Sequence, residues 1–257
     1  MVSRLKSLLI WIGIILLVLF WLPMLALRRL FDRDPAYYYT GKLFRNLGKA
    51  ISRINPAWKI AITGHAGIDD RRPYVMVCNH LSQADIPLIS NLPWEMKWIA
   101  KKELFEVPVV GWMMRLAGDI SVDRQAINRR KETFRQARYY LERECSVMFF
   151  PEGTRSRNGK LNRFTNGAFE LAVSESIPIL PMVIDGTQNT LPKRSWKFGK
   201  AKHIKLKVLD PLETGGLGRE DIGDLSNQVR SRIACQLAEW RGKRTMEVDN
   251  LSQQHQC

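Results

Sequence analysis

The sequence contains a histidine and an aspartate, His80 and Asp85, whose setting suits acid–base chemistry. The apolar run from Tyr74 to Cys78 precedes them and predicts a buried strand, whereas Asn79 and Ser82 favour a turn and a helix N-terminus. We therefore expect His80 in a strand-to-helix turn and Asp85 in the first turn of that helix. A carboxylate there can bind one imidazole nitrogen and leave the other free to act as a base. A histidine–aspartate pair that occurs without other motifs more often reflects a capped helix with an incidental histidine. Other residues must therefore decide between this interpretation and a catalytic pair.

A second polar segment follows a second apolar run. Cys145 to Phe150 predicts another strand, and Glu152-Gly153-Thr154-Arg155 comes directly after it. Together with the first segment, this one resembles the lysophosphatidate acyltransferase family, part of the wider glycerophospholipid acyltransferases, which carries a His-x4-Asp block and a Glu-Gly-Thr-Arg block. Two weaker blocks of the family also match in order, Gly118 to Arg124 and Ile177 to Val183. The ordered set is specific, although each block alone is weak.

The resemblance implies acyl transfer from a thioester to the free hydroxyl of a lysophospholipid acceptor. Acyl-CoA or acyl-carrier protein would be the co-substrate, and no further cofactor is expected. His80 would be the general base, oriented by Asp85, and no protein nucleophile is needed. Cys78 is close in sequence, but an apolar strand makes it a poor nucleophile. The resemblance assigns substrate binding to Glu152, Gly153, Thr154, Arg155, Arg124 and Lys101.

The positive side chains in this set suit the phosphate of the acceptor, because the planar guanidinium of arginine matches a phosphate group. The resemblance gives this role to Arg155 first and to Arg124 next, and more loosely to Lys101, Lys102 and Arg157. A surface ion pair is the alternative for each arginine. Glu152 either accepts a hydrogen bond from the glycerol hydroxyl or braces its own loop. The family commonly reads Phe-Lys-x-Gly-Ala-Phe further on, where this chain has Thr165 in place of the lysine. The missing cation leaves room for an acceptor other than a simple phosphomonoester.

The composition fits one sizeable hydrophobic core and a basic surface. The chain has 257 residues, of which 45% are hydrophobic, and a formal net charge of +15. Such a charge suits nucleic acid, an anionic membrane surface or an acidic partner. The four cysteines show no Cys-x-x-Cys spacing, and His80 and Asp85 lack a third ligand, so we predict no metal site. Cys78 and Cys145 lie in apolar runs, which predicts buried thiols.

Residues 1–54 predict a membrane anchor followed by an interfacial helix. Leu8 to Leu27 carries no charge and, as a helix of about 30 Å, is long enough to span a bilayer. Pro23 leaves open a monotopic helix that does not cross. In residues 35–54 the apolar side chains recur at helical spacing, which predicts an amphipathic helix on an anionic membrane surface, with Tyr37 to Tyr39 at the headgroups; a helix packed on the core is the alternative. The basic residues largely outside its apolar stripe are Lys42, Arg45, Lys49 and Arg53.

Strands and helices alternate along residues 55–240, which predicts a three-layer α/β domain around a mostly parallel sheet. The resemblance implies that this range is the acyltransferase domain. Strands are expected near residues 58–63, 74–78, 96–100, 119–122, 145–150, 179–184 and 203–209, the last as an edge strand. Helices are expected near residues 85–90, 109–116, 125–143, 167–174 and 219–240. Residues 241–257 predict a disordered polar tail.

The leading hypothesis is a membrane-bound acyltransferase that converts 1-acylglycerol-3-phosphate to phosphatidate at the cytoplasmic face, where the acyl donor is found. The same chemistry on another lysolipid, such as a lyso-aminolipid or a remodelled lysophospholipid, is the alternative. A non-catalytic membrane-surface or nucleic-acid binder would explain the charge but neither His80 with Asp85 nor the segment from Glu152 to Arg155. A nucleic-acid binder also needs no segment such as Leu8 to Leu27, so nucleic acid is not an expected partner.

Overall fold

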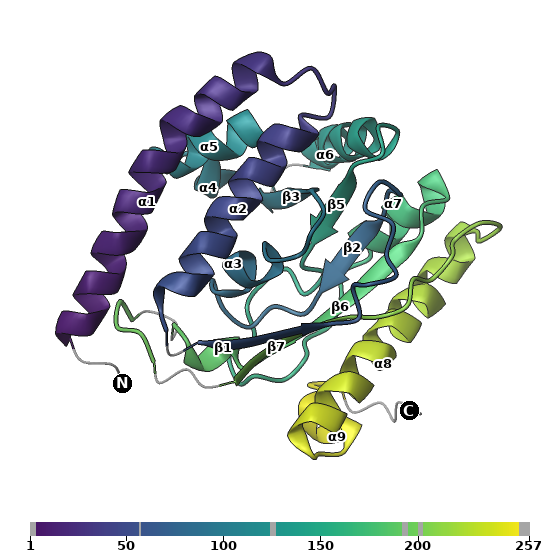
Figure 1. The fold of residues 1–257 in the computed structure, drawn as a ribbon. Coiled ribbons are helices and arrows are strands. Elements are labelled where there is room, and N and C mark those ends of the chain that lie inside the picture. The colour runs from purple at the N-terminus through teal and green to yellow at the C-terminus, as the bar shows by residue number, and fades with distance from the viewer. Residues whose placement is uncertain (1–3, 57, 124–126, 192–194, 200–202, 252–257) are drawn as a thin grey trace.

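The computed structural model describes residues 4–56, 58–123, 127–191, 195–199 and 203–251, and seven strands in these ranges form one sheet (Figure 1). The strand order is β1-β7-β6-β2-β5-β3-β4, and all neighbours pair in parallel except β6 with β7. The strands are β1 (Lys59–Thr63), β2 (Val75–Cys78), β3 (Met96–Lys101), β4 (Ile120–Val122), β5 (Ser146–Phe149), β6 (Ile179–Asp185) and β7 (His203–Val208). The predicted mostly parallel sheet is confirmed.

The prediction that β7 is an edge strand is wrong. β7 lies between β1 and β6, parallel to the first and antiparallel to the second. Ile204, Leu206 and Val208 are buried, while the lysines between them are half-buried. The alternation therefore reports that one face of the strand meets the core, which says nothing about whether its hydrogen-bonding sides are paired.

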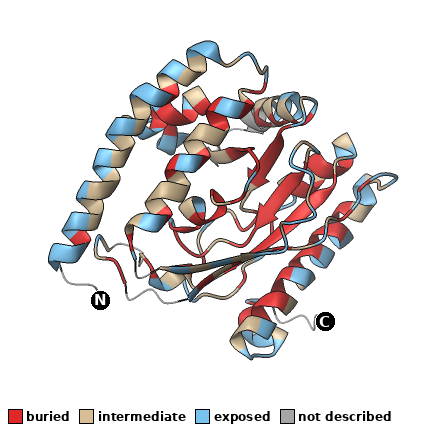
Figure 2. Ribbon diagram, in the orientation of Figure 1, coloured by how far each residue is buried: buried red, intermediate tan, exposed pale blue. Residues whose placement is uncertain are grey.

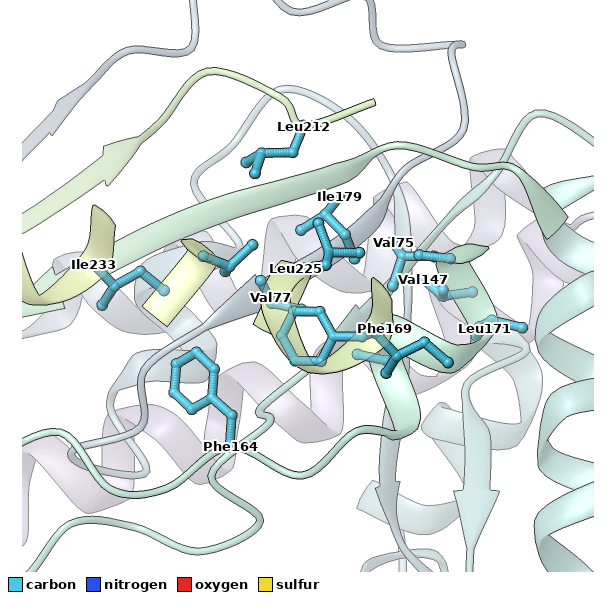
Figure 3. Close-up of a cluster of buried hydrophobic side chains, with 14 of the residues drawn as sticks. Val75, Val77, Val147, Phe164, Phe169, Leu171, Ile179, Leu212, Leu225 and Ile233 are labelled. Atoms are coloured by element: carbon cyan, nitrogen blue, oxygen red, sulfur yellow. The ribbon is translucent and has the colours of Figure 1, made fainter. Parts of the chain in front are cut away.

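Helices cover both faces of the sheet, and the buried residues concentrate in the strands between them (Figure 2). Val75 and Val77 of β2 face a hydrophobic core shared with helices α6, α7 and α8, and many of its side chains are drawn in Figure 3. Met76 and Cys78 face the opposite core, which includes side chains of α3. The predicted three-layer α/β architecture is confirmed. The helices are α1 (Arg4–Phe31), α2 (Tyr38–Ile54), α3 (Asp85–Ile89), α4 (Lys102–Phe105), α5 (Val110–Ala117), α6 (Ile127–Leu141), α7 (Gly167–Glu175), α8 (Ile222–Arg241) and α9 (Thr245–Val248), with short 3-10 turns at Thr187–Asn189 and Arg219–Asp221.

The long apolar helix α1 includes the predicted segment and continues through Pro23. It packs lengthwise on the rest of the chain. Near its start, the indole N–H of Trp11 donates to the Trp196 carbonyl at 2.7 Å, and further along Trp21 donates to the Leu43 carbonyl at 2.9 Å. Leu25 is fully buried. The outward side of α1 is apolar and exposed, and the helix is long and apolar enough to cross a membrane.

Helix α2 has the predicted amphipathic pattern, but two of its residues are not where the sequence analysis placed them. Arg45 is buried rather than on a free basic face, and Tyr38 is buried rather than at headgroup level. Gly41 explains the close approach of the helix, because a Cβ there would lie 1.9 Å from the Glu95 carboxylate. Arg53 is exposed, and Lys42 and Lys49 are half-buried. Local periodicity could not reveal that buried carboxylates in the sheet attract Arg45.

A buried ionic network joins α2 to β3 and β4. Arg45 Nη2 lies 2.8 Å from Asp119 Oδ1, and its Nε lies 3.6 Å from Glu95 Oε2. Lys97 Nζ donates to Glu95 Oε1 at 3.1 Å and to the Ala117 carbonyl at 2.8 Å. Burial raises the pKa of the Glu95 carboxyl, and the charges of Lys97 and Arg45 act against that rise. Two cations thus balance two carboxylates inside the protein.

The C-terminal segment through residue 251 is folded, contrary to the disordered tail predicted for residues 241–257, of which residues 252–257 lie outside the described residues. Arg230 of α8 forms a buried ion pair with Asp249, and Arg241 Nη2 lies 2.6 Å from Asp185 Oδ1. The backbone at the end of α9 and just after it also pairs with the loop that follows the Glu-Gly-Thr-Arg segment, since Leu161 N donates to the Val248 carbonyl at 2.8 Å and Asn250 N donates to the Leu161 carbonyl at 2.9 Å. Long-range ion pairs, which composition does not reveal, hold this polar segment.

Replacing Arg45 tests the ionic network. Arg45→Met leaves Lys97 as the remaining described cation for the carboxylates of Glu95 and Asp119. Breaking a buried pair in this way costs about 3–5 kcal/mol, so the free energy of unfolding should fall by about that amount. Thermal or denaturant unfolding in detergent measures it. Arg53→Met, an exposed arginine on the same helix, should change stability by no more than about 0.5 kcal/mol. Equal stabilities of the two variants would contradict a structural role for the network.

Candidate active site

The predicted histidine–aspartate pair forms at the carboxyl end of β2. α3 begins at Asp85, as expected, and His80 Nδ1 lies 2.7 Å from Asp85 Oδ2. The same oxygen accepts hydrogen bonds from the backbone N–H groups of Leu81 at 2.7 Å and Ser82 at 2.9 Å. Asp85 therefore holds both the imidazole and the turn that carries it. His80 Nε2 makes no hydrogen bond to any residue that the structure describes, which leaves this nitrogen for substrate.

Aromatic packing fixes the orientation of the imidazole. The His80 ring stacks on Phe150, with centroids 3.9 Å apart and an interplanar angle of 14°. Trp98 packs on Phe150, with ring centroids 5.7 Å apart. The side chain of His80 is 16% exposed, so solvent and substrate reach only part of it. The ring is thus held on one side by Asp85 and along one face by Phe150.

Glu152 braces the loops around His80. Its carboxylate is buried and accepts hydrogen bonds from the backbone N–H of His80 at 2.7 Å and of Asn162 at 3.0 Å. Burial raises the pKa of Glu152 to about 7, and these hydrogen bonds act against the rise. Of the two roles considered for Glu152, this geometry favours the brace, because the side chain is not part of the cavity wall described next.

A cavity of about 1210 Å³ opens beside His80. It lies at the carboxyl ends of β2, β3 and β5, the edge of a parallel sheet where ligands commonly bind. Four of the predicted substrate-binding residues line it together: Lys101 at the end of β3, and Gly153, Thr154 and Arg155 after β5. Apolar side chains form much of the remaining wall, namely Ile86, Trp98, Ile99, Leu104, Phe134, Phe149, Phe150 and Phe164. Arg124, the other predicted residue, lies outside the described residues.

Arg163 is a cavity residue that the sequence analysis missed. It lines the cavity with Lys101 and Arg155, and none of the three forms an ion pair with a described residue. The signal was the adjacent departure from the family pattern, since Arg163 lies two residues before Thr165, which replaces the usual lysine. Thr165 also lines the cavity. An arginine therefore lies close in sequence to Thr165, the position at which the family commonly has lysine.

The two thiols in the apolar strands carry no sign of reactivity. Cys78 and Cys145 are buried and free. Burial raises the pKa of Cys78 well above the ordinary value of a thiol, and nearby Asp85 and Glu152 raise it further. Cys78 points into the core with Met76 rather than into the cavity. In the described part of the chain, no cluster of three His, Cys, Asp or Glu side chains is placed to hold a metal ion.

The fold and site define an α/β protein with a histidine–carboxylate pair and three cations that line one cavity. An acyltransferase family model matches residues 59–185. A chloroplastic 1-acyl-sn-glycerol-3-phosphate acyltransferase of Arabidopsis thaliana is 30% identical over 208 residues, which cover 80% of this chain and 56% of the relative. The alpha form of the same enzyme from Mus musculus is 34% identical over 177 residues, 67% of this chain and 61% of the relative. The chain thus spans less than two thirds of the length of these relatives.

A solved structure matches more completely. The crystal structure of the 1-acyl-sn-glycerophosphate (LPA) acyltransferase PlsC from Thermotoga maritima superposes with a TM-score of 0.79 at 27% identity, covering 93% of this chain and 96% of that one. The chain belongs to the acyltransferase family, which confirms the resemblance seen in the sequence.

The raised pKa of Glu152 predicts a pH-dependent stability. The folded-state pKa of about 7 exceeds the ordinary 4.5, so stability is fully present below that ordinary value and is lost as the pH rises through about 7. Glu152→Gln cannot ionise. The unfolding free energy of the wild type minus that of Glu152→Gln should therefore fall by roughly 2–3 kcal/mol between about pH 5 and about pH 8.

Denaturant unfolding in detergent across this pH range measures the difference. The exposed Glu103→Gln variant serves as the control, and its stability should track the wild type at every pH. A constant or growing advantage of the wild type over Glu152→Gln as the pH rises would contradict the raised pKa.

Proposed function

We propose that this chain is a membrane-bound O-acyltransferase that moves a fatty acyl group from an acyl thioester to the free hydroxyl of 1-acylglycerol-3-phosphate, giving phosphatidate. The observation that carries the proposal is that His80 lines one largely apolar cavity together with Lys101, Arg155 and Arg163. Among the described residues, none of these three cations has an ion-pair partner and His80 Nε2 has no hydrogen-bond partner. The relatives named for this reaction support it.

In this mechanism His80 acts as a general base and Asp85 orients it. Nε2 takes the proton from the acceptor hydroxyl as the oxygen attacks the thioester carbonyl. The tetrahedral intermediate then collapses, the carbon–sulfur bond breaks, and the imidazolium returns its proton to the thiolate that leaves. The 2.7 Å contact of Nδ1 with Asp85 stabilises the imidazolium that forms in between. No acyl-enzyme is needed, which agrees with the burial of Cys78.

The three cavity cations are the proposed partners of the acceptor's phosphate. Arg155 and Arg163 offer planar guanidinium groups, and Lys101 adds a third charge from a different strand end. The apolar walls formed by Trp98, Phe149 and other side chains would receive acyl chains. A different lysolipid headgroup remains the second candidate, because Thr165 stands where the family commonly has lysine.

We propose that α1 holds the protein on the cytoplasmic face of the membrane, where acyl-CoA or acyl-carrier protein is found. The helix contacts the domain through Trp11 near one end and Leu25 near the other. A helix packed in this way along its length would pull the domain into the hydrocarbon if it crossed the bilayer. A monotopic placement, with the outward apolar side of α1 in one leaflet, avoids that cost.

The first functional prediction concerns the base. His80→Ala should lower turnover by at least about 10²-fold, because the hydroxyl then has no group to accept its proton. Phosphatidate formation from lysophosphatidate and acyl-CoA, read by lipid mass spectrometry, measures this. Cys78→Ala is the matched control on the same strand end and should keep turnover within a few-fold. An active, folded His80→Ala protein or an inactive, folded Cys78→Ala protein would sink the mechanism.

The second functional prediction concerns the missed arginine. Arg163→Ala should raise the KM for lysophosphatidate by roughly tenfold with little change in kcat, since one charge-assisted contact to phosphate is lost. Adding Thr165→Lys to that variant should restore much of the loss. Arg157→Ala removes an exposed arginine that does not line the cavity and should have no effect. If a lysolipid lacking the phosphomonoester were the better acceptor of the wild type, the second candidate would replace the first.

A further inference from the structure

The chain exposes a second group of apolar side chains apart from α1. Residues 104–112, here called the α4–α5 turn, include Leu104, Val107, Val110 and Trp112 among the exposed large hydrophobic residues, and Trp112 is 54% exposed. Outside α1, nine such side chains are exposed in the described part of the chain, and four of them belong to this turn. They are therefore clustered rather than scattered, and a clustered exposed patch calls for a partner.

Backbone strain gives the turn its shape. Val109 has φ 65° and ψ −60°, and the N–H of Val110 donates to the Pro108 carbonyl at 2.7 Å. This is a γ-turn of the rare, strained kind, and a positive φ is unusual for a β-branched residue. Gly111 lets the chain close behind it, because a Cβ there would lie 2.1 Å from the Phe105 carbonyl. The turn therefore costs backbone strain energy, and its exposed side chains do not pack in a hydrophobic core.

The inner side of the turn packs on a cluster that includes α1. Val109 packs against a cluster formed by Leu25 of α1, Leu47 of α2 and Met113 of α5. Figure 1 shows α5 beside α1, and the shared cluster shows that the two helices pack directly on each other. The exposed apolar side of α1 and the exposed side chains of the turn are thus parts of neighbouring elements held together by one core.

The turn also lies beside the active-site cavity. Leu104, its first residue, lines the cavity together with Lys101. Exposed charged residues around the turn are nearly balanced: Lys101, Lys102, Arg115, Glu103 and Glu106. This balance favours insertion of apolar side chains over attraction by charge alone. A lipid leaflet is the partner that would cover the exposed side of α1, the turn and the mouth of the cavity together.

We propose that the α4–α5 turn is a second membrane contact, which inserts Val107, Val110 and Trp112 into the leaflet that holds α1. The cavity then opens beside the lipid headgroups, and a lysolipid enters without drawing its acyl chain through water. The inference rests on the membrane attachment in the proposed function, but its test does not depend on acyl transfer.

Fluorescence of Trp112 on vesicles tests this contact. The full-length chain is bound to vesicles of phosphatidylcholine and phosphatidylglycerol that carry bromine on their acyl chains. The emission that disappears in Trp112→Phe isolates the signal of Trp112 from the other tryptophans. Bromine should quench that component roughly twofold or more, because interfacial side chains lie within the reach of the upper acyl chain, and aqueous iodide should quench it little. Quenching by iodide alone would overturn the proposal, and insensitivity to both would indicate a protein partner or a second copy instead.

A variant pair gives an independent readout. Val107→Ser combined with Trp112→Ser should weaken partition into the same vesicles on the order of tenfold, since two apolar side chains no longer leave water. Met246→Ser, which changes an exposed residue on α9, is the matched control and should partition like the wild type. Unchanged partition of the double variant would also overturn the proposal. Quenching without any acyl transfer would instead refute the proposed function and leave the membrane contact intact.

Discussion

One buried carboxylate, that of Glu152, joins the loops on which the candidate site depends. It accepts hydrogen bonds from His80 N and Asn162 N, two backbone groups that lie outside the sheet and need partners. The loop that follows β5 makes a second hydrogen bond to His80, because Ser156 N donates to the His80 carbonyl at 2.8 Å. The peptide unit of the histidine is therefore held on both sides by the segment that also carries Arg155. His80 and the segment that carries Arg155 keep a fixed spatial relation for this reason.

A second constraint fixes the wall of the cavity against the N-terminal helices α1 and α2. Asp119 Oδ1 accepts hydrogen bonds from Arg45 of α2 at 2.8 Å and from the backbone N–H of Trp98 at 3.0 Å. Trp98 lines the cavity and packs on Phe150, which stacks on His80. The buried network thus connects α2, on which α1 rests, with the aromatic surface under the imidazole. Buried charges of this kind are poor sources of net stability, but they penalise any other placement of the helix.

The setting of three cations, rather than their lack of partners, distinguishes the site from the rest of a basic protein. Elsewhere many arginines have carboxylate partners, such as Arg72 with Glu213 and Arg138 with Glu175. Lys101, Arg155 and Arg163 have none among the described residues, and they line one concave, largely apolar cavity, a setting that strengthens the field of its charges. Asp123 and Glu170 line the same cavity, so the cations outnumber the carboxylates there by one. The net charge alone indicated an anionic partner, whereas the local arrangement indicates where an anionic group would bind.

The sequence by itself determined most of the elements and the core of the site. Apolar runs and turn residues placed the strands and helices, and the His80–Asp85 spacing needed only a local strand-to-helix turn. Only the tertiary structure decided the long-range contacts: the burial of Arg45 against Asp119, the internal position of β7, the docking of the tail through Arg230 and Asp249, and the place of Arg163 in the same cavity as Lys101. Periodicity records which face of an element is buried, because that depends on the residue's own polarity. It does not record which distant group meets that face, because the partner is set by packing of the whole chain.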